Sequence, residues 1–329
     1  MQLGYALSSE EHRPLDLVDH ARRAEAAGFT FALISDHYHP WIDKQGQSPF
    51  VWSVIGGIAV VTEKLRIGTG VTCPTIRIHP AIVAQTAATA ASMLPGRFFL
   101  GVGTGENLNE HVIGDRWPPA DLRRRMLEEA VEVMRRLWQG QLTSIEGEYY
   151  RVENARIYTL PEDPPEIYVA AAGPEAAELG GRIGDGLVST APDPALVAAY
   201  EDAGGQPPKI GELTVCWAKS ERDARRVAFE WWPNAALQGP LAQELPLPSH
   251  FEEAAGMVGE EDVADVVICG PDPARHLEGI QKFADAGFDH VYVHQVGPDQ
   301  EGFLRFYEQE ILPEAANFRS RRRGKKKVA

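Results

Sequence analysis

The sequence predicts an α/β protein: a single (β/α)8 barrel domain over residues 1–318, with an insertion between its seventh and eighth strands at about residues 233–261. Eight short apolar runs are spread along the chain, and a segment of helical length follows each of them. The runs show little alternation of polar and apolar residues, which is typical of parallel strands buried on both faces. Eight strand–helix units in succession close into a barrel.

The apolar runs are the strand candidates, in barrel order along the chain. Helices are predicted between them where apolar residues recur at helical spacing, as at Leu17, Ala21 and Ala24, with Gly28 as a stop signal. Residues 141–165 form an extended excursion, and residues 233–261 break the rhythm, with helix again from Asp262. The eight runs are residues 3–7, 31–35, 65–72, 98–102, 167–171, 186–189, 213–217 and 291–294.

The charge of the chain argues against nucleic-acid and membrane partners. The 329 residues carry a net charge of −15, at 44% hydrophobic and 24% charged residues, a composition typical of ordinary globular proteins. Residues 319–329 hold seven basic residues and no acidic one, so without these seven charges the rest of the chain stands at −22. Such an acidic body is a poor partner for phosphates or anionic lipids. The basic tail is predicted to be solvated and disordered.

The cysteines and the hydrophobic pattern predict a soluble, cytoplasmic protein. Cys73, Cys216 and Cys269 are few, odd in number and far apart, which favours reduced thiols. The N-terminus lacks the basic and apolar regions of a signal peptide. No apolar run reaches the ~18 residues of a membrane span.

Polar residues follow several predicted strands, where barrel enzymes build their active sites. The third and fifth strands instead run into small, uncharged residues at 69–74 and 170–174, where a flat ring can approach the backbone closely. The polar candidates are Glu10 after the first strand, Asp36, His37 and Trp41 after the second, and Glu106 and Asn109 after the fourth.

Two further motifs were weighed against simpler interpretations. Gly101 and Gly103 begin a dinucleotide fingerprint, but Glu106 stands where its third glycine belongs, so the pattern indicates a tight strand-to-helix turn. His37 and His39, with His294, could ligate a metal, but the fifth and sixth strands offer no further ligand, so no metal site is predicted.

The candidate acid–base residues have structural alternatives. The imidazole of His37 is suited to take a proton from a hydroxyl, yet either His37 or His39 could serve only to cap a turn. Glu106 sits at a predicted helix start, where a carboxylate is favoured by the helix dipole.

Three segments carry a resemblance to a known family. They are Ser-Asp-His-Tyr-His-Pro-Trp at 35–41, Gly-Val-Gly-Thr-Gly-Glu-Asn-Leu-Asn-Glu at 101–110 and Ala-Ala-Ala-Gly-Pro at 170–174. Over residues 3 to about 313 the chain resembles the luciferase-like oxidoreductases, and within them the coenzyme F420-dependent glucose-6-phosphate dehydrogenases. The resemblance implies a homodimer of barrels that binds the deazaflavin F420 at the strand ends and transfers a hydride from a sugar carbinol carbon to C5 of F420.

The resemblance also implies roles for individual residues. His37 would be the base, Glu106 the acid on the N1 side of the deazaflavin, and Trp41 a stabiliser of the bound sugar, with Glu10 on the substrate side. A cis peptide bond is implied between Gly70 and Val71. The implied cofactor-binding residues are Asp36, Gly70, Val71, Cys73, Gly105, Asn109, Ala171, Ala172 and Gly173.

One departure from the family concerns the substrate phosphate, which two lysines and an arginine hold in the family. Two of these positions align with Ala242 and Val266, and the third falls between residues 184 and 208, where no basic residue occurs. No Lys or Arg occurs between residues 227 and 274 either. Since a phosphate dianion needs charge-assisted donors, we expect a substrate that is not held as glucose 6-phosphate is, such as an uncharged sugar or alcohol.

Other functions remain open on the sequence alone. The same residues could work in reverse, in a reductase fed by reduced F420, because the base of one direction is the acid of the other. The barrel also fits an FMN-dependent luciferase-like monooxygenase, a metal-dependent hydrolase or a non-catalytic deazaflavin-binding protein.

Overall fold

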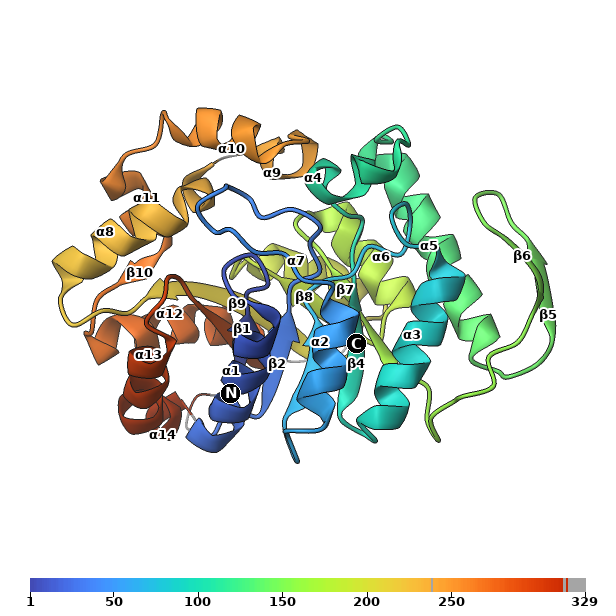
Figure 1. The fold of residues 1–329 in the computed structure, drawn as a ribbon, viewed down its shortest axis with the longest axis horizontal. Coiled ribbons are helices and arrows are strands. Elements are labelled where there is room, and N and C mark those ends of the chain that lie inside the picture. The colour runs from blue at the N-terminus through green and yellow to red at the C-terminus, as the bar shows by residue number, and fades with distance from the viewer. Residues whose placement is uncertain (238, 316–317, 319–329) are drawn as a thin grey trace, which may run out of the picture.

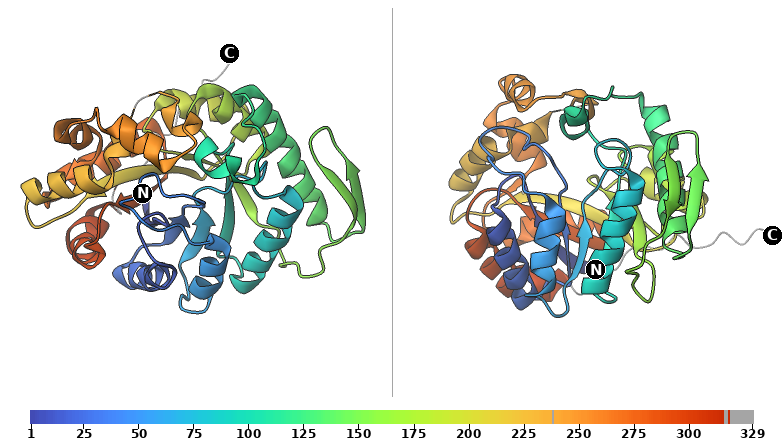
Figure 2. Two further views of the ribbon diagram at one scale, coloured as in Figure 1. Left: turned by 45° about the horizontal axis from the view of Figure 1, so that its top comes forward. Right: turned by 45° about the vertical axis from the view of Figure 1, so that its right-hand side comes forward.

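A closed barrel of eight parallel strands surrounded by helices forms the protein, as predicted (Figures 1 and 2). The computed structural model describes residues 1–237, 239–315 and 318. The barrel closes because β8 and β11 both pair with β9, while β11 also pairs with β1. The strands are β1 (Gln2–Leu7), β2 (Phe31–Ile34), β3 (Arg66–Thr69), β4 (Phe98–Val102), β7 (Glu166–Ala170), β8 (Gly186–Ser189), β9 (Lys209–Cys216) and β11 (His290–Gln295).

Helices follow the strands in the predicted alternation. Prolines open many of them, since proline at a first helical turn costs no hydrogen bond. The outer helices are α1 (Pro14–Ala27), α2 (Val51–Ala59), α3 (Pro80–Met93), α5 (Ala120–Leu137), α6 (Pro174–Ile183), α7 (Pro194–Asp202), α8 (Glu221–Trp231), α12 (Pro273–Ala286) and α13 (Gln300–Phe306), which continues through η3 (Tyr307–Ile311) into α14 (Leu312–Ala315).

A compact group of large side chains fills the part of the barrel interior that lies away from the carboxyl ends of the strands. This group is separate from the core between the strands and the helices. It leaves the interior near the carboxyl ends of the strands free for a cavity. Glycines make room for it: a Cβ at Gly4 would lie 2.4 Å from the ring of Phe31. The group consists of Phe31, Leu33, Phe99, Tyr168, Val188, Ile210 and Tyr292.

Two segments depart from the strand–helix alternation. The predicted excursion contains the hairpin of β5 (Thr143–Glu146) and β6 (Arg151–Ala155), which stands beside α5 (Figure 1). The stretch expected to be an insertion holds η2 (Pro233–Ala236), α9 (Leu241–Glu244) and α10 (Pro248–Ala255). In Figure 1, α9 and α10 lie on the same side of the barrel as α4 (Asn107–Glu110) and η1 (His111–Ile113).

The sequence did not predict a ninth strand in this sheet. After α11 (Glu260–Val266), the two-residue strand β10 (Ile268–Cys269) pairs in parallel with the end of β9. In the described part of the chain, no helix is long and apolar enough to cross a membrane. The predicted basic tail, residues 319–329, lies outside the described residues.

Candidate active site

The ends of the strands surround a cavity of about 820 Å³, within the usual range for a small-molecule site. The residues singled out in the sequence all line this cavity, so the fold brings them together from five strand ends. They are Glu10, Asp36, His37, Trp41, Gly70, Val71, Cys73, Gly105, Glu106, Asn109, Ala171, Ala172 and Gly173.

His37 lies just past β2 with its imidazole between two carboxylates. Its Nδ1 is 3.3 Å from the carbonyl oxygen of His39, so that nitrogen carries the proton and donates it. Its Nε2 lies 3.4 Å from Glu10 Oε1 and 3.5 Å from Glu106 Oε2. Burial by itself would lower the pKa of His37, but the two carboxylates outweigh it and raise that pKa above its usual value. Nε2 is therefore a strengthened proton acceptor that faces the cavity.

Glu10 is fixed as an ionised carboxylate. Its Oε2 accepts hydrogen bonds from Ser35 Oγ at 2.6 Å and from Ser8 Oγ at 3.1 Å, and the residue is only 3% exposed. Burial favours the neutral acid, but His37 and the Ser35 hydroxyl reverse this and lower the pKa of Glu10 below its usual value. The negative charge beside His37 thus persists at neutral pH.

Glu106 precedes α4 and makes no side-chain bond to the helix backbone, so capping does not account for its placement. Its Oε2 accepts a hydrogen bond of 2.9 Å from Asn109 Nδ2. The Oδ1 of Asn109 in turn accepts from the backbone N–H groups of Tyr38 and His39, at 2.9 and 3.2 Å. Asn109 thereby ties the segment that carries Glu106 to the loop that carries His37.

Trp41 forms an aromatic wall beside the base. Its ring centroid lies 4.9 Å from that of His37 and 5.1 Å from that of Phe251 on α10. Its backbone N–H donates to Gln45 Oε1 at 2.9 Å, and Gln45 Nε2 donates to the carbonyl oxygen of Trp231 at 3.0 Å. The loop after β2 is therefore docked on the segment between α8 and α10.

Gly101 and Gly103, the glycines of the incomplete dinucleotide fingerprint, allow the segment that follows β3 to approach β4 closely. The implied cis peptide bond between Gly70 and Val71 is present. The chain rejoins β4 at Thr72, whose N–H donates to the carbonyl oxygen of Gly101 at 2.9 Å. A Cβ at Gly103 would lie 2.8 Å from a methyl carbon of Val71. Glycine is thus required here by the packing of Val71 against β4.

A buried ion cluster under the cis peptide escaped the sequence analysis. Arg77 is 7% exposed in its side chain and donates to Asp36 Oδ1 at 2.8 Å. The second oxygen of Asp36 accepts from Thr72 Oγ1 at 2.7 Å, so Asp36 braces the cavity wall from behind. The backbone N–H of Arg77 donates to Glu110 Oε2 at 2.7 Å. Burial is the largest cause that raises the pKa of Glu110, to about 7.

The two sides of the cavity differ in chemistry. The wall formed by β3, β4 and β7 presents small, uncharged residues, among them Gly70, Gly103, Ala170, Ala172 and Gly173. A flat, uncharged ring fits such a wall because the backbone can be approached closely. The opposite wall, formed by β9, β11 and β1, is polar and carries Glu212, Thr214, His294 and Glu10.

Several cavity residues had no assigned role in the sequence analysis. Glu212 directly precedes the apolar run 213–217 and Tyr292 lies inside the run 291–294, where nothing marks them as facing a cavity. His294 had been weighed as a metal ligand, but the described residues hold no group of three or more His, Cys, Asp or Glu that could bind a metal. Arg123 and Arg124 on α5 also line the cavity, and no local motif distinguishes them from surface charges.

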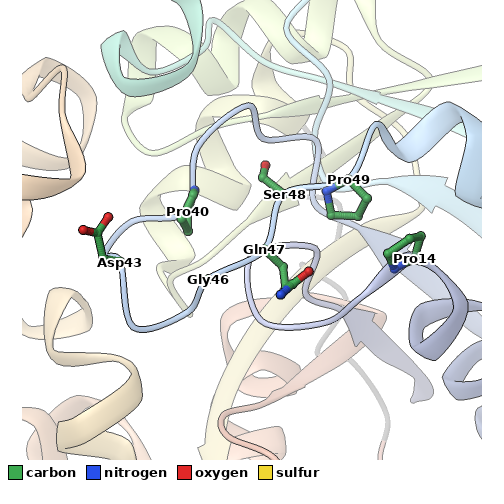
Figure 3. A pocket seen from close by; sticks show the side chains of 7 residues that line it. All are labelled: Pro14, Pro40, Asp43, Gly46, Gln47, Ser48 and Pro49. Carbon is green, nitrogen blue, oxygen red and sulfur yellow. The ribbon is translucent and has the colours of Figure 1, made fainter.

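A second, shallower hollow of about 580 Å³ lies on the loop after β2 (Figure 3). It contains none of the predicted site residues, and Asp43 is its one titratable side chain. The lining residues are Pro14, Pro40, Asp43, Gly46, Gln47, Ser48 and Pro49. We therefore place the candidate active site in the barrel cavity.

Comparisons with known proteins agree on one family. The luciferase-like monooxygenase family matches residues 1–290. Two F420-dependent glucose-6-phosphate dehydrogenases are similar over 95% of this chain: one from Nakamurella multipartita at 38% identity, with 96% of its length covered, and one from Microbacterium testaceum at 37%, with 97% covered.

Solved structures extend the comparison. An F420-dependent secondary alcohol dehydrogenase, determined in complex with an F420–acetone adduct, is similar with a TM-score of 0.87 and 31% identity, over 94% of this chain and 98% of that one. The coenzyme F420-dependent tetrahydromethanopterin reductase of Methanopyrus kandleri shares the fold, with a TM-score of 0.77 and 22% identity, over 95% of this chain and 99% of that one.

Proposed function

Because the chain belongs to the luciferase-like family, and within it to the F420-dependent dehydrogenases, we propose that it oxidises an uncharged sugar or alcohol to the carbonyl compound with coenzyme F420 as hydride acceptor. The observation that carries this proposal is His37: its Nε2 is a strengthened base, 3.4 Å from Glu10 and 3.5 Å from Glu106, in a cavity with one wall of small, uncharged residues.

The reaction divides between the cofactor and the side chains. F420, when bound, supplies a C5 atom that accepts the hydride from the carbinol carbon. His37 accepts the hydroxyl proton at Nε2 as the C=O bond forms, and the carboxylate of Glu10 stabilises the resulting imidazolium. Trp41 packs beside the carbinol and helps to exclude water. Glu106 would serve as the acid on the cofactor side, as the resemblance to the family implies.

The small-residue wall would hold the deazaflavin ring. Val71, Gly103, Ala171 and Gly173 line this wall and leave room for a flat ring along the backbone. Arg124, which is half-buried on α5 and lines the same cavity, would attract the anionic part of the cofactor. In this proposal Asp36 acts indirectly, because both of its oxygens are already engaged by Arg77 and Thr72.

The proposal of an uncharged substrate rests on the chemistry of the substrate wall. Ala242 and Val266, which align with basic residues of the family, line the cavity without charge. Arg123 is committed elsewhere: it lies 4.0 Å from the ring centroid of Trp117 and donates to the carbonyl oxygen of Pro118 at 2.8 Å. Its charge is further balanced by Glu244 at 3.4 Å. Arg124 is the other arginine among the residues that line the cavity, and the substrate test below asks whether it binds a substrate phosphate instead of the cofactor.

The test follows the loss of the absorbance of oxidised F420 with propan-2-ol, glucose and glucose 6-phosphate in parallel. We expect loss with an unphosphorylated compound. Loss with glucose 6-phosphate alone would contradict the proposed substrate class and assign the phosphate to Arg124. No loss with any of them, together with tight binding of reduced F420, would favour a reductase.

We further propose that the enzyme works as a homodimer in the cytoplasm, as the resemblance to its family implies. Light scattering of the purified protein tests the dimer: a mass close to that of one 36.1 kDa chain would contradict it.

A further inference from the structure

The polar wall of the cavity carries a second carboxylate–histidine pair that the proposed reaction does not use. His294 on β11 and Glu212 on β9 both line the cavity, on the side opposite the small-residue wall. The loop after β1 supplies a carboxylate to each of the two histidines: Glu10 lies beside His37, and the next residue, Glu11, binds His294.

His294 is held from behind and aimed into the cavity. Its Nε2 lies 2.9 Å from Glu11 Oε2, and the other oxygen of Glu11 accepts from the N–H of Gly297 at 2.8 Å. The ring of Trp232 packs against the imidazole at a centroid distance of 4.5 Å. The side chain of His294 is only 4% exposed, yet no hydrogen bond to Nδ1 occurs within the described part of the chain.

The Oε1 atom of Glu212 faces Nδ1 of His294 and likewise has no hydrogen bond among the described residues. Its Oε2 accepts from the hydroxyl of Tyr292 at 2.8 Å, while Oε1 lies 3.8 Å from His294 Nδ1, too far for a direct hydrogen bond. Burial raises the pKa of Glu212, and the bond to Glu11 outweighs burial and raises the pKa of His294.

We propose that Glu212 and His294 form a subsite for a second hydroxyl group of the substrate, next to the carbinol that His37 deprotonates. An oxygen atom about 2.8 Å from each group bridges the gap between Oε1 and Nδ1. The substrate class is then an uncharged diol or polyol, cyclic or open-chain. This inference rests on the proposed dehydrogenase function.

A hydroxyl group is the natural partner for this pair. With the proton on His294, the hydroxyl accepts from Nδ1–H and donates to Glu212. With the proton on Glu212, it accepts from the carboxyl and donates to Nδ1. An anion finds no such match, because Glu10 and Glu212 already place two carboxyl groups on this side. Trp41 and Trp232 add the aromatic surface against which the C–H face of a sugar packs.

The kinetic test compares propan-2-ol with propane-1,2-diol, which differ by one hydroxyl group. For the unmodified enzyme we expect kcat/KM to be at least roughly tenfold higher for the diol, as one hydrogen bond to a charged group gives. Glu212→Met should abolish this preference through KM of the diol. Glu212→Gln, which keeps shape and one hydrogen bond, should fall between the two.

A matched control separates this effect from general perturbation. Glu166 also accepts a hydrogen bond from a barrel tyrosine, Tyr168, at 2.7 Å, but it stands at the opposite end of the barrel. Glu166→Gln should leave both substrates unaffected. Saturation-transfer NMR on the cofactor-free protein should show contact with the diol that Glu212→Met weakens.

The outcomes are distinguishable. Equal constants for both alcohols in the unmodified enzyme, or a preference that persists in folded Glu212→Met and Glu212→Gln, would overturn the subsite. If no alcohol reduces F420, the dehydrogenase function fails, and the NMR signal alone decides whether the diol binds at Glu212.

Discussion

The carboxylate of Glu10 and the imidazole of His37 come from the ends of two adjacent strands, and their nearest atoms, Oε1 and Nε2, are 3.4 Å apart. Ser35, which directly follows β2 and lies two residues before His37, donates the hydrogen bond that orients Glu10. The base and the group that tunes it are thus fixed to each other by the pairing of β1 with β2. Their relation sets the pH range in which the enzyme can act.

Glu10→Gln should move the acidic limb of the pH profile of kcat/KM toward lower pH. His37 works as a base only when neutral, and the Glu10 carboxylate raises its pKa, so the enzyme loses activity as pH falls through that raised value. Removal of the negative charge lowers the pKa of His37 and keeps the base neutral to lower pH. An acidic limb that does not move would show that Glu10 does not tune the base.

His37→Ala should lower kcat by about 10²–10⁴-fold, the usual contribution of a general base, with F420 binding affinity changed by less than about threefold. His39→Ala is the matched control, because the Nδ1 of His39 contacts the carbonyl oxygen of Leu108 instead of the cavity. Stopped-flow absorbance measures the first effect and fluorescence titration of F420 the second. Equal losses of kcat in the two variants would contradict the role of His37 as the general base.

Arg77→Met should destabilise the fold by about 3–5 kcal/mol, because it leaves the buried carboxylate of Asp36 without its ion pair. Urea denaturation of the cofactor-free protein measures this. Arg135→Met is the control: Arg135 and Asp185 are 3.0 Å apart but each is 44% exposed, and exposed pairs contribute about 1 kcal/mol or less. Similar losses of unfolding free energy in both variants would mean that the buried ion cluster contributes no more to stability than an exposed ion pair.

Glu110 should make stability fall as pH rises. Its pKa in the folded protein is about 7, against an ordinary value of 4.5 for a glutamate, so between these values the folded state binds a proton that the unfolded state has released. The stabilisation is present below the unfolded value and is lost as pH rises through about 7. Between pH 5 and pH 8 the unmodified protein should lose up to about 3 kcal/mol relative to Glu110→Gln. Parallel pH curves for the two proteins would contradict this.

Gly105→Ala should destabilise the protein and weaken F420 binding. Gly105 has φ of +79°, and a Cβ there would lie 2.6 Å from Cys73 Sγ. Gly114 has a similar φ of +88° with nothing within 4 Å of a Cβ, so Gly114→Ala should show the backbone cost of about 1–2 kcal/mol alone. Thermal melts should separate the two, and equal melting temperatures would indicate that the Cys73 contact relaxes freely.

The sequence was sufficient for the barrel because its signals are local. Each barrel strand contains an apolar run, and each helix has apolar residues at helical spacing together with its own start or stop signals. The strand ends then predicted polar residues that line the cavity, since parallel strands bring their carboxyl ends to one mouth. Two boundaries were wrong by several residues. β9 begins at Lys209, because Glu212 interrupts the apolar pattern in the strand while facing the cavity. The run predicted over 65–72 continues past β3, which ends at Thr69.

What the sequence could not predict depends on contacts between distant segments. Arg77 is one arginine among many until the fold buries it against Asp36. Glu11 and His294 are 283 residues apart and meet only because β1 and β11 are neighbours in the closed barrel. The two-residue β10 carries no periodicity at all, and it forms because the end of β9 offers free backbone groups.

One continuous stretch of chain, from Trp232 through Phe251 to Val266, adds aromatic and apolar residues to the cavity beside Trp41, while His37 and the small-residue wall come from the ends of the barrel strands. The two are therefore encoded separately. Substrate range can diverge through changes in this single stretch while the proton and hydride chemistry stays intact, and exchange of the stretch between relatives is the shortest route to an enzyme of altered selectivity.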